Sequence, residues 1–368
     1  MQALEAKFTK PDFEPIPITK NDSQKSTFGF SFGKCLEKVP NEVFATAEKT
    51  ITSKTYNDWR QDFLKDGYAI LKGAISPEKS KEYQNRAFNW VTSFGTELDI
   101  SKAETWKEEN IPAQTDFNVF CSNAIAHEEF MWDIRCEEGV IKPFRDIYGT
   151  DELLVSFDSL NITFPRADKK PKEKWLHVDQ SPFKTGLQCI QGIVALSNHG
   201  PNDGGLVVYK GSHKYFEEFF NTQVDHDNWD TLDYYGFSNE QAQFFLNRGC
   251  EEVKVCCEPG DVILWDSRTC HWGQEPCPNS KQIRTVVYVS YSPRYFATSE
   301  SIEHKKKAFQ MWSNTTHWPH DNIIYKSNAV LREDGSIDPK SRFKPTCLPK
   351  MDKRMLQLAG LIPYGNQA

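Results

Sequence analysis

The sequence lacks the features that would place the protein in a membrane, on nucleic acid or on the secretory path. It contains no run that approaches the roughly 20 apolar residues of a membrane span, and neither end resembles a targeting signal. Its ten cysteines include no CxxC pair, and a disulfide framework is typical of much shorter secreted chains. The net charge of −7 lacks the basic excess of most nucleic-acid binders. We therefore expect a cytoplasmic protein with reduced thiols and no nucleic-acid or membrane partner; its oligomeric state stays open.

What the sequence does contain is the composition of a large globular domain. Of its 368 residues, 38% are hydrophobic and 26% are charged, and the aromatic share of 13% indicates a core or pocket lined with rings. Residues 1–50 are polar, rich in lysine and interrupted by proline, so we expect an extended or partly disordered arm. Residues 51–368 then form a single domain, because no repeat or clean boundary divides them.

The order of the expected elements indicates the fold class. Helices are expected over 57–67, 76–94 and 125–147, with a short strand over 68–72 between the first two. From residue 153 onward, short apolar runs alternate with turn residues, which is typical of strands. Strands are expected over 153–164, 188–196, 205–209, 252–257, 261–265 and 284–291. This order predicts a mainly β protein with flanking helices, a cupin-like jelly roll whose core spans about 150–295 and is followed by a helical or extended segment over 299–368.

Two histidines and an aspartate have the spacing of an iron site. His177 and Asp179 are two residues apart, so on a strand both side chains point to the same face. His271 follows 94 residues later at the end of an expected strand, and strands distant in sequence lie side by side in a jelly roll. A set of two histidines and one carboxylate binds Fe(II) on one face and leaves three positions open. We therefore predict that His177, Asp179 and His271 are the catalytic metal ligands.

The His-x-acid motif alone is weak evidence, because nine histidines and 51 acidic residues produce roughly one such triplet by chance. A second triplet begins at His127, in a helical stretch where residues two apart diverge by about 200 degrees. We therefore interpret His127 as a surface or second-layer residue. The pair in His317-Trp-Pro-His320 is separated by a proline, which breaks the turn that would align the two rings. His213 follows a tight turn and is expected to be structural.

Arg284 is the candidate for binding an anionic co-substrate. It lies thirteen residues after His271 and opens a strong apolar strand. A buried guanidinium can bind the far end of a dicarboxylate through two parallel hydrogen bonds. A salt bridge at the end of the strand is the alternative.

In this order, the motifs resemble those of the phytanoyl-CoA dioxygenase family. The matching pieces lie between about residues 60 and 295 and are Asp66-Gly-Tyr-Ala-Ile-Leu-Lys-Gly, Ser76-Pro-Glu, His177-Val-Asp, Asp203-Gly-Gly-Leu-Val-Val-Tyr-Lys-Gly-Ser-His213, Pro259-Gly-Asp, His271 and Arg284. The segment around His177 resembles fungal members more than the human acyl-CoA hydroxylase. The resemblance implies a double-stranded β-helix that uses Fe(II) and O2, with 2-oxoglutarate as a co-substrate held through its C5 carboxylate by Arg284.

The chain also departs from the pattern of the family. Lys174 stands where some members have Gln, and Gly273 stands where some have Ser or Thr. We therefore take Asn161 and Gln191 as candidates for the remaining contacts of 2-oxoglutarate; the alternative is that both are core amides bonded to neighbouring backbone. Halogenating relatives replace the metal-binding carboxylate with a small residue, so the presence of Asp179 favours hydroxylation or a related oxidation.

Two further segments allow two interpretations each. Residues 221–249 form a long insertion, which is either a lid over the site or a helix pair that packs its aromatic residues inward. The lysine run over 169–174 either attracts an anionic substrate or is a solvated loop.

The expected function is that of an Fe(II)- and 2-oxoglutarate-dependent dioxygenase. It would oxidise a small organic substrate, most simply by hydroxylation, and release succinate and CO2. A cupin-like iron enzyme that does not use 2-oxoglutarate and a catalytically silent jelly-roll binding protein are the alternatives.

Overall fold

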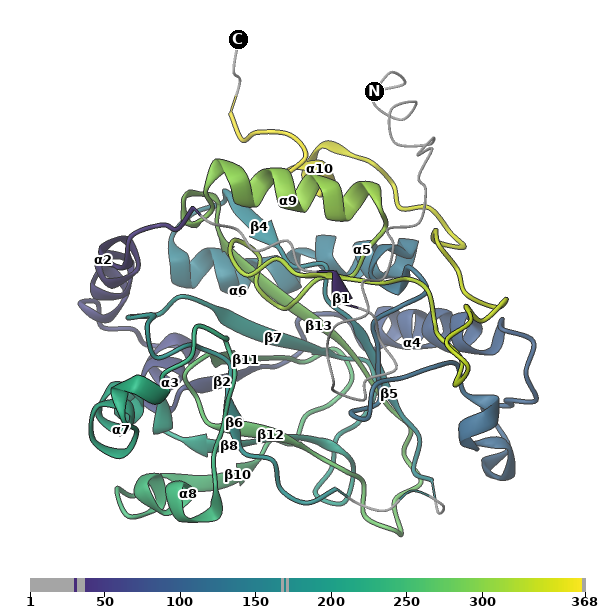
Figure 1. The fold of residues 1–368 in the computed structure, drawn as a ribbon, viewed down its shortest axis with the longest axis horizontal. Helices are drawn as coiled ribbons and strands as arrows, with labels where there is room; N and C mark the ends of the chain where they lie inside the picture. The colour runs from purple at the N-terminus through teal and green to yellow at the C-terminus, as the bar shows by residue number, and fades with distance from the viewer. Residues whose placement is uncertain (1–29, 32–36, 167–168, 170–171, 366–368) are drawn as a thin grey trace.

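Two antiparallel sheets form the centre of the protein in a computed structural model that describes residues 30–31, 37–166, 169 and 172–365 (Figure 1). In spatial order, the larger sheet consists of β2 (Tyr68–Leu71), β11 (Val262–Asp266), β7 (Ile190–Ala195), β13 (Arg284–Pro293), β5 (Leu160–Thr163) and β3 (Val119–Phe120), with β4 (Leu153–Val155) also paired to β13. The smaller sheet consists of β10 (Glu251–Lys254), β8 (Gly205–Lys210), β12 (His271–Gln274), β6 (His177–Val178) and β9 (Tyr235–Gly236).

The path of the chain through these sheets is that of a double-stranded β-helix. From β5 to β8 the chain alternates between the larger and the smaller sheet, and it alternates again from β10 to β13. The central orders that result are β11-β7-β13-β5 on one side and β10-β8-β12-β6 on the other. The jelly roll expected from the strand pattern is therefore confirmed. The term "mainly β" describes only this core, since helices hold 33% of the residues and strands 18%.

Alternation along each strand divides the apolar residues between the inside and the outside of the β-helix. Ile193, Val208 and Trp265 point inward and pack against one another between the sheets. Val194 and Val287 point the other way, into the large cluster under the helices. Those helices are α4 (Pro77–Thr92), α5 (Glu129–Cys136), α6 (Glu138–Tyr148), α9 (Ser299–Gln310) and α10 (Lys353–Leu358). The outer face of the smaller sheet packs against α7 (Phe216–Gln223) and α8 (Asn239–Leu246).

Local sequence signals explain where the first helices begin and end. Helix α3 (Trp59–Asp66) is capped by the Asp58 side chain and ends at Gly67, whose φ of 80° is favourable only for glycine. Ser76 caps α4 in the same way, with Pro77 in the first turn. The helix expected over 125–147 is instead broken at Glu137, whose ψ of 128° separates α5 from α6.

The two ends of the chain differ from the simplest expectation. Residues 1–29 and 32–36 of the expected N-terminal arm lie outside the described residues. Residues 41–50 are helical and not extended. They form most of α2 (Asn41–Thr52), which buries Phe44 and Ile51 against the core. In the C-terminal segment, β14 (Tyr325–Lys326) pairs with β1 (Phe30–Ser31).

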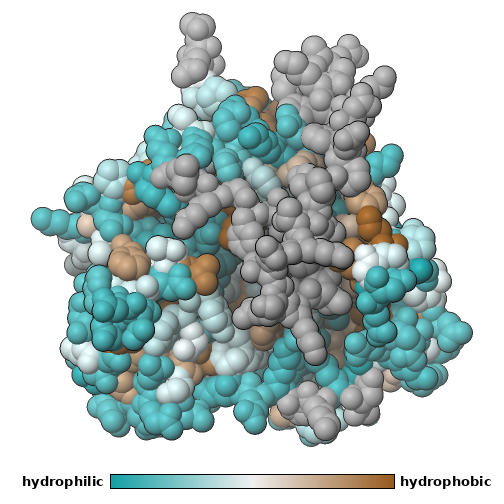
Figure 2. All heavy atoms as spheres, viewed as in Figure 1, coloured by the Kyte–Doolittle hydropathy of each residue, from teal (hydrophilic) through white to brown (hydrophobic). Residues whose placement is uncertain are grey.

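No helix in the described part of the chain is both long and apolar enough to cross a membrane. The face shown in Figure 2 is largely hydrophilic, including the surface over α7, and its apolar residues are scattered. Isolated surface apolar residues of this kind are normal in globular proteins.

Candidate metal centre and co-substrate site

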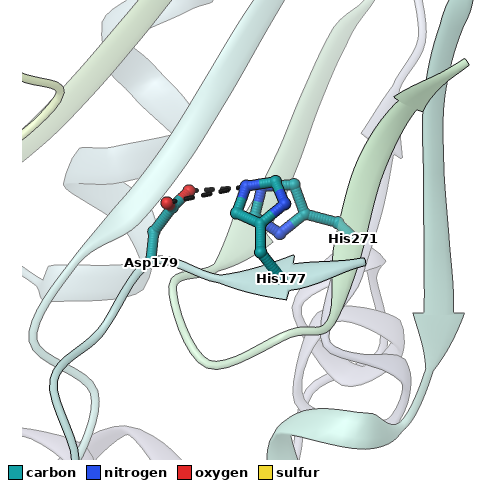
Figure 3. Close-up of side chains that lie close together, drawn as sticks. All are labelled: His177, Asp179 and His271. Carbon is teal, nitrogen blue, oxygen red and sulfur yellow. Dashed lines mark ion pairs between the residues drawn. The ribbon is translucent and has the colours of Figure 1, made fainter. Parts of the chain in front are cut away.

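The three predicted metal ligands meet on the inner side of the smaller sheet. His177 on β6 and His271 on β12 are directly paired across the two antiparallel strands, and their ring centroids are 4.2 Å apart. Asp179 follows β6 immediately and turns its carboxylate toward both rings (Figure 3). The three ligand atoms all lie within 4.8 Å of one another. The strand register therefore brings together residues that are 94 positions apart in sequence.

Backbone contacts fix which ring nitrogen of each histidine is free. Nδ1 of His177 lies 3.1 Å from the carbonyl oxygen of Trp175, and Nδ1 of His271 lies 2.9 Å from that of Thr269. Because a carbonyl oxygen can only accept, each Nδ1 carries a proton, which leaves Nε2 as the ring nitrogen available to a metal. The Nε2 atoms are the ones that face Asp179, at 3.6 Å for His177 and 3.2 Å for His271. The indole of Trp175 stacks on His177 with an interplanar angle of 9°.

Asp179 is held as a carboxylate by its neighbours. Its burial favours the neutral acid, but His177 and His271 outweigh that effect and hold the pKa of Asp179 well below its usual value. Burial lowers the pKa of His271, which favours the neutral ring that a metal requires. From the inside of β7, Nε2 of Gln191 donates a hydrogen bond of 2.9 Å to Oδ2 of Asp179. The predicted amide Gln191 therefore contacts the carboxylate of the candidate ligand Asp179.

Arg284 and Asn161 line the same cavity of about 250 Å³ as the three ligands. Arg284 is only 6% exposed, and its Nη1 donates to Oδ1 of Asn161 at 2.8 Å. The amide nitrogen of Asn161 is anchored on the carbonyl of Phe117. No carboxylate pairs with Arg284 in the described part of the chain, and its Nε is buried without a partner. A strand-end salt bridge is therefore absent among the described residues, and the guanidinium keeps donor capacity for an anion.

The residues present suit both groups that the sequence predicted. Two neutral imidazole nitrogens and one ionised carboxylate are the donor set of non-haem Fe(II) sites. The unpartnered Nε of Arg284 satisfies the second requirement, a buried cation that can bind a carboxylate inside the same cavity.

The two positions at which the chain departs from the family pattern differ in whether they line the cavity. Nζ of Lys174 bonds Glu252 at 2.6 Å and does not line the cavity, so it provides no contact there. Gly273 does line it, and an added Cβ would touch only the indole of Trp175, at 3.4 Å. Lys169 is paired with Glu275 at 3.1 Å. The lysine run thus offers little free positive charge among its described residues.

The rival histidines lie in three different environments. His127 is fully buried, with Nε2 bonded to the carbonyl of Ser313, so of its two interpretations, surface or second-layer, the surface one is wrong. The aromatic rings that enclose it supplied apolar contacts that the helical pattern did not reveal. His213 bonds the carbonyl of Leu64, in agreement with a structural role. His317 lines the cavity beside the triad although it is not one of the clustered ligands.

The insertion over 221–249 has features of both interpretations. Trp229, Tyr235 and Phe237 pack inward with the aromatic residues of α7 and α8. Tyr234 instead stays 51% exposed and lies 5.2 Å from His177, ring centroid to ring centroid. Strand β9 of this insertion pairs with β6, which carries His177. A movement of the insertion as a lid stays a prediction.

Three other residues that line the cavity, Asp158, His317 and Lys326, were not predicted to lie there. Asp158 precedes β5 and has no motif around it, whereas His317 and Lys326 come from the segment after α9. Only the folded arrangement brings these positions to the triad.

Known proteins resemble the chain over most of its length. The sequence profile of the phytanoyl-CoA dioxygenase (PhyH) family matches residues 63–279. A curated relative from Aspergillus versicolor, described as Ava biosynthesis cluster protein O, is 36% identical over 271 residues, which cover 72% of this chain and 87% of the relative.

Two solved structures are also similar. EctD from S. alaskensis in its apoform has a TM-score of 0.46 and 18% identity, over 67% of this chain and 82% of that chain. SnoN, crystallised with Fe3+, alpha ketoglutarate and nogalamycin RO, has a TM-score of 0.45 and 13% identity, over 68% of this chain and 84% of that chain. The family match contains all three clustered ligands. The chain therefore belongs to the phytanoyl-CoA dioxygenase family.

Proposed function

We propose that His177, Asp179 and His271 bind Fe(II) and that Arg284 binds the distal carboxylate of 2-oxoglutarate. The enzyme then oxidises a small organic substrate, most simply by hydroxylation, with release of succinate and CO2. The observation that carries this proposal is that the clustered ligands and a buried, unneutralised guanidinium line one cavity.

Bound Fe(II), with 2-oxoglutarate and O2, supplies the oxidising power needed to attack an unactivated C–H bond. The contribution of the protein is to position the reacting groups. The carbonyls of Trp175 and Thr269 orient the two imidazoles, and the amide of Gln191 orients the carboxylate of Asp179.

Asn161 acts on the co-substrate through Arg284. Its side-chain oxygen holds Nη1 and leaves the Nε edge of the guanidinium for the co-substrate. Ile193, Leu206 and Trp265 supply apolar cavity wall, which reduces the water around the reacting groups. Asn161 and Gln191 thus serve the site as positioning residues, in addition to any direct contact with 2-oxoglutarate.

The test is an anaerobic visible spectrum of the full-length enzyme after addition of Fe(II) and then 2-oxoglutarate. Wild type should show the broad charge-transfer band of iron chelated by an oxo acid, and Asp179→Ala should not. Asp225→Ala removes an exposed carboxylate of the insertion and should keep the band. Iron binding without a band would favour the oxo-acid-independent cupin enzyme, and failure to bind iron would favour the silent binding protein.

A cytoplasmic location is part of the same proposal. The nine described cysteines are all free, and Cys256 and Cys347 are exposed as thiols. Free exposed thiols suit a reducing compartment. Fractionation of the source cells with an antibody against the protein tests this point, and recovery in a secretory fraction would contradict it.

A further inference from the structure

The cavity has a second polar end, away from Arg284. Arg284 pairs with Thr163 at one end of β5, and Asp158 lies five residues before Thr163 along the same stretch. At about 3.3 Å per residue, the two backbone positions are roughly 16 Å apart. Both Asp158 and Arg284 nevertheless line the same cavity, which also contains the metal ligands. The cavity therefore extends well beyond the part that Arg284 can reach.

The segment after α9 closes this second end. The backbone N–H of Thr315 donates to the carbonyl of Phe157 at 2.9 Å, and the amide of Asn314 donates to the hydroxyl of Ser159 at 3.2 Å. The N–H of Lys326 in turn donates to the carbonyl of Asn314. These bonds fix the segment on both sides of Asp158. His317 and Lys326, which line the cavity, therefore belong to the Asp158 end.

The described residues give the carboxylate of Asp158 no cationic hydrogen-bond donor, although the buried Arg135 lies close enough to act on it electrostatically. Asp158 is 8% exposed, and its Oδ1 accepts one hydrogen bond, from the N–H of Ser159 at 2.7 Å. No ion pair to Asp158 exists among the described residues. The nearby Arg135 donates to the main-chain oxygen of Asp158 and to that of Ala126, and not to the carboxylate. A buried carboxylate with spare acceptor capacity at a cavity wall is best satisfied by a cationic donor from a ligand.

The neighbouring groups strengthen this arrangement. Nε2 of His317 is buried without a hydrogen-bond partner, and the ring is close enough to Asp179 to act on it electrostatically. No partner of the Lys326 ammonium is present in the described ranges. Three polar groups of different chemistry thus border one end of the cavity with unused hydrogen-bonding capacity.

We propose that this end binds the organic substrate and that Asp158 holds a protonated nitrogen of it. The substrate class is then a small nitrogen base, with Lys326 and His317 available to its oxygen acceptors. The proposal rests on the proposed function, because the oxidised C–H bond must lie between Asp158 and the metal ligands. 2-Oxoglutarate does not occupy this end, since its two negative charges would be repelled by Asp158 and are attracted by Arg284.

Calorimetry with three probes of similar size tests the proposal: 2-phenylethylamine as the cation, 2-phenylethanol as the neutral molecule and 3-phenylpropionate as the anion. The full-length enzyme is loaded anaerobically with Fe(II) and 2-oxoglutarate, and the titrations are repeated without either. Wild type should bind the amine at least about tenfold more tightly than the alcohol, as expected for a charge-assisted hydrogen bond in a buried site. The amine preference in the unloaded enzyme reports on Asp158 even if the cofactor assignment fails.

Two variants locate the effect. Asp158→Asn keeps the shape of the side chain and should abolish the preference for the amine, while binding of the alcohol stays unchanged. Glu275→Gln is the matched control, because Glu275 also lines the cavity but is neutralised by Lys169. Equal binding of amine and alcohol, preference for the anion, or binding of none of the probes to wild type would overturn the proposal. Retention of the amine preference in Asp158→Asn would overturn it as well.

Discussion

Replacement of Gln191 by leucine should weaken Fe(II) binding without removing any metal ligand. Gln191 is 6% exposed, and its amide donates the 2.9 Å hydrogen bond that orients Oδ2 of Asp179. A hydrogen bond to a charged group contributes about 1.5–3 kcal/mol, and each 1.4 kcal/mol corresponds to about a factor of ten in affinity. Contacts that orient metal ligands are typically worth about ten- to hundredfold in metal affinity. Both arguments give a loss of about ten- to hundredfold for Gln191→Leu.

The assay is an anaerobic titration in which the protein competes for Fe(II) with a chromophoric chelator. Gln188→Leu is the matched control, because Gln188 is also buried, three residues earlier, but bonds Asn41 and the carbonyl of Thr185, neither of which lines the cavity. Its Fe(II) affinity should equal that of wild type. An affinity of Gln191→Leu within about twofold of wild type would refute the reasoning, and so would an equal loss in both variants.

Three further predictions concern single residues. Asp179→Ala leaves two imidazole ligands and should abolish turnover at every iron concentration that does not saturate the site. Succinate release at the wild-type rate would contradict the assignment of the ligands. Arg284→Met should raise the half-saturating concentration of 2-oxoglutarate at least about tenfold and leave Fe(II) affinity unchanged, so a variant with unaltered 2-oxoglutarate dependence would return Arg284 to a structural role. Burial lowers the pKa of His127 from 6.5 to about 3, so the unfolded chain takes up a proton between these values that the folded protein excludes, and stability is lost as pH falls from about 6.5 toward 3. His127→Phe should reduce the dependence of unfolding free energy on pH by about 1.4 kcal/mol per pH unit, measured by denaturant titrations at several pH values. The remaining dependence includes His320, whose pKa is lowered in the same way. An unchanged dependence would contradict the prediction.

The clustering of the three candidate ligands was predictable because its geometry is local or follows from strand register. His177 and Asp179 share a face by the period of a strand, and the jelly-roll order brings His271 opposite His177. The glycine, proline and serine signals around residues 67 and 76 likewise set the ends of α3 and α4 through local backbone conformation and a side-chain cap. Such features depend on a few neighbouring residues, and the sequence displays them directly.

Features that depend on distant contacts were missed or misread. His127 has a helical sequence context, but its burial arises from Phe309 and Trp312, more than 180 positions away. The helical character of residues 41–50 similarly depends on packing of Phe44 against residues such as Phe296. Neither hydropathy nor periodicity of a segment reveals the partner that will cover it. For the same reason, the sequence could not predict that Asp158 and His317 line one cavity, since their proximity depends on the bonds between residues 157–159 and 314–315.

The two ends of the cavity are held in place by different kinds of interaction. His177, His271 and Arg284 stand on paired strands, where a change of register by one residue would turn every side chain to the opposite face. His317 stands in an irregular stretch that is attached by a few individual hydrogen bonds, and only farther along, at Lys326 in β14, does this segment have a sheet register, with β1. Substitutions in that segment can therefore alter the wall that meets the organic substrate without displacing the iron ligands. Within one β-helix, the oxidising chemistry can stay constant while the chemistry of substrate recognition changes.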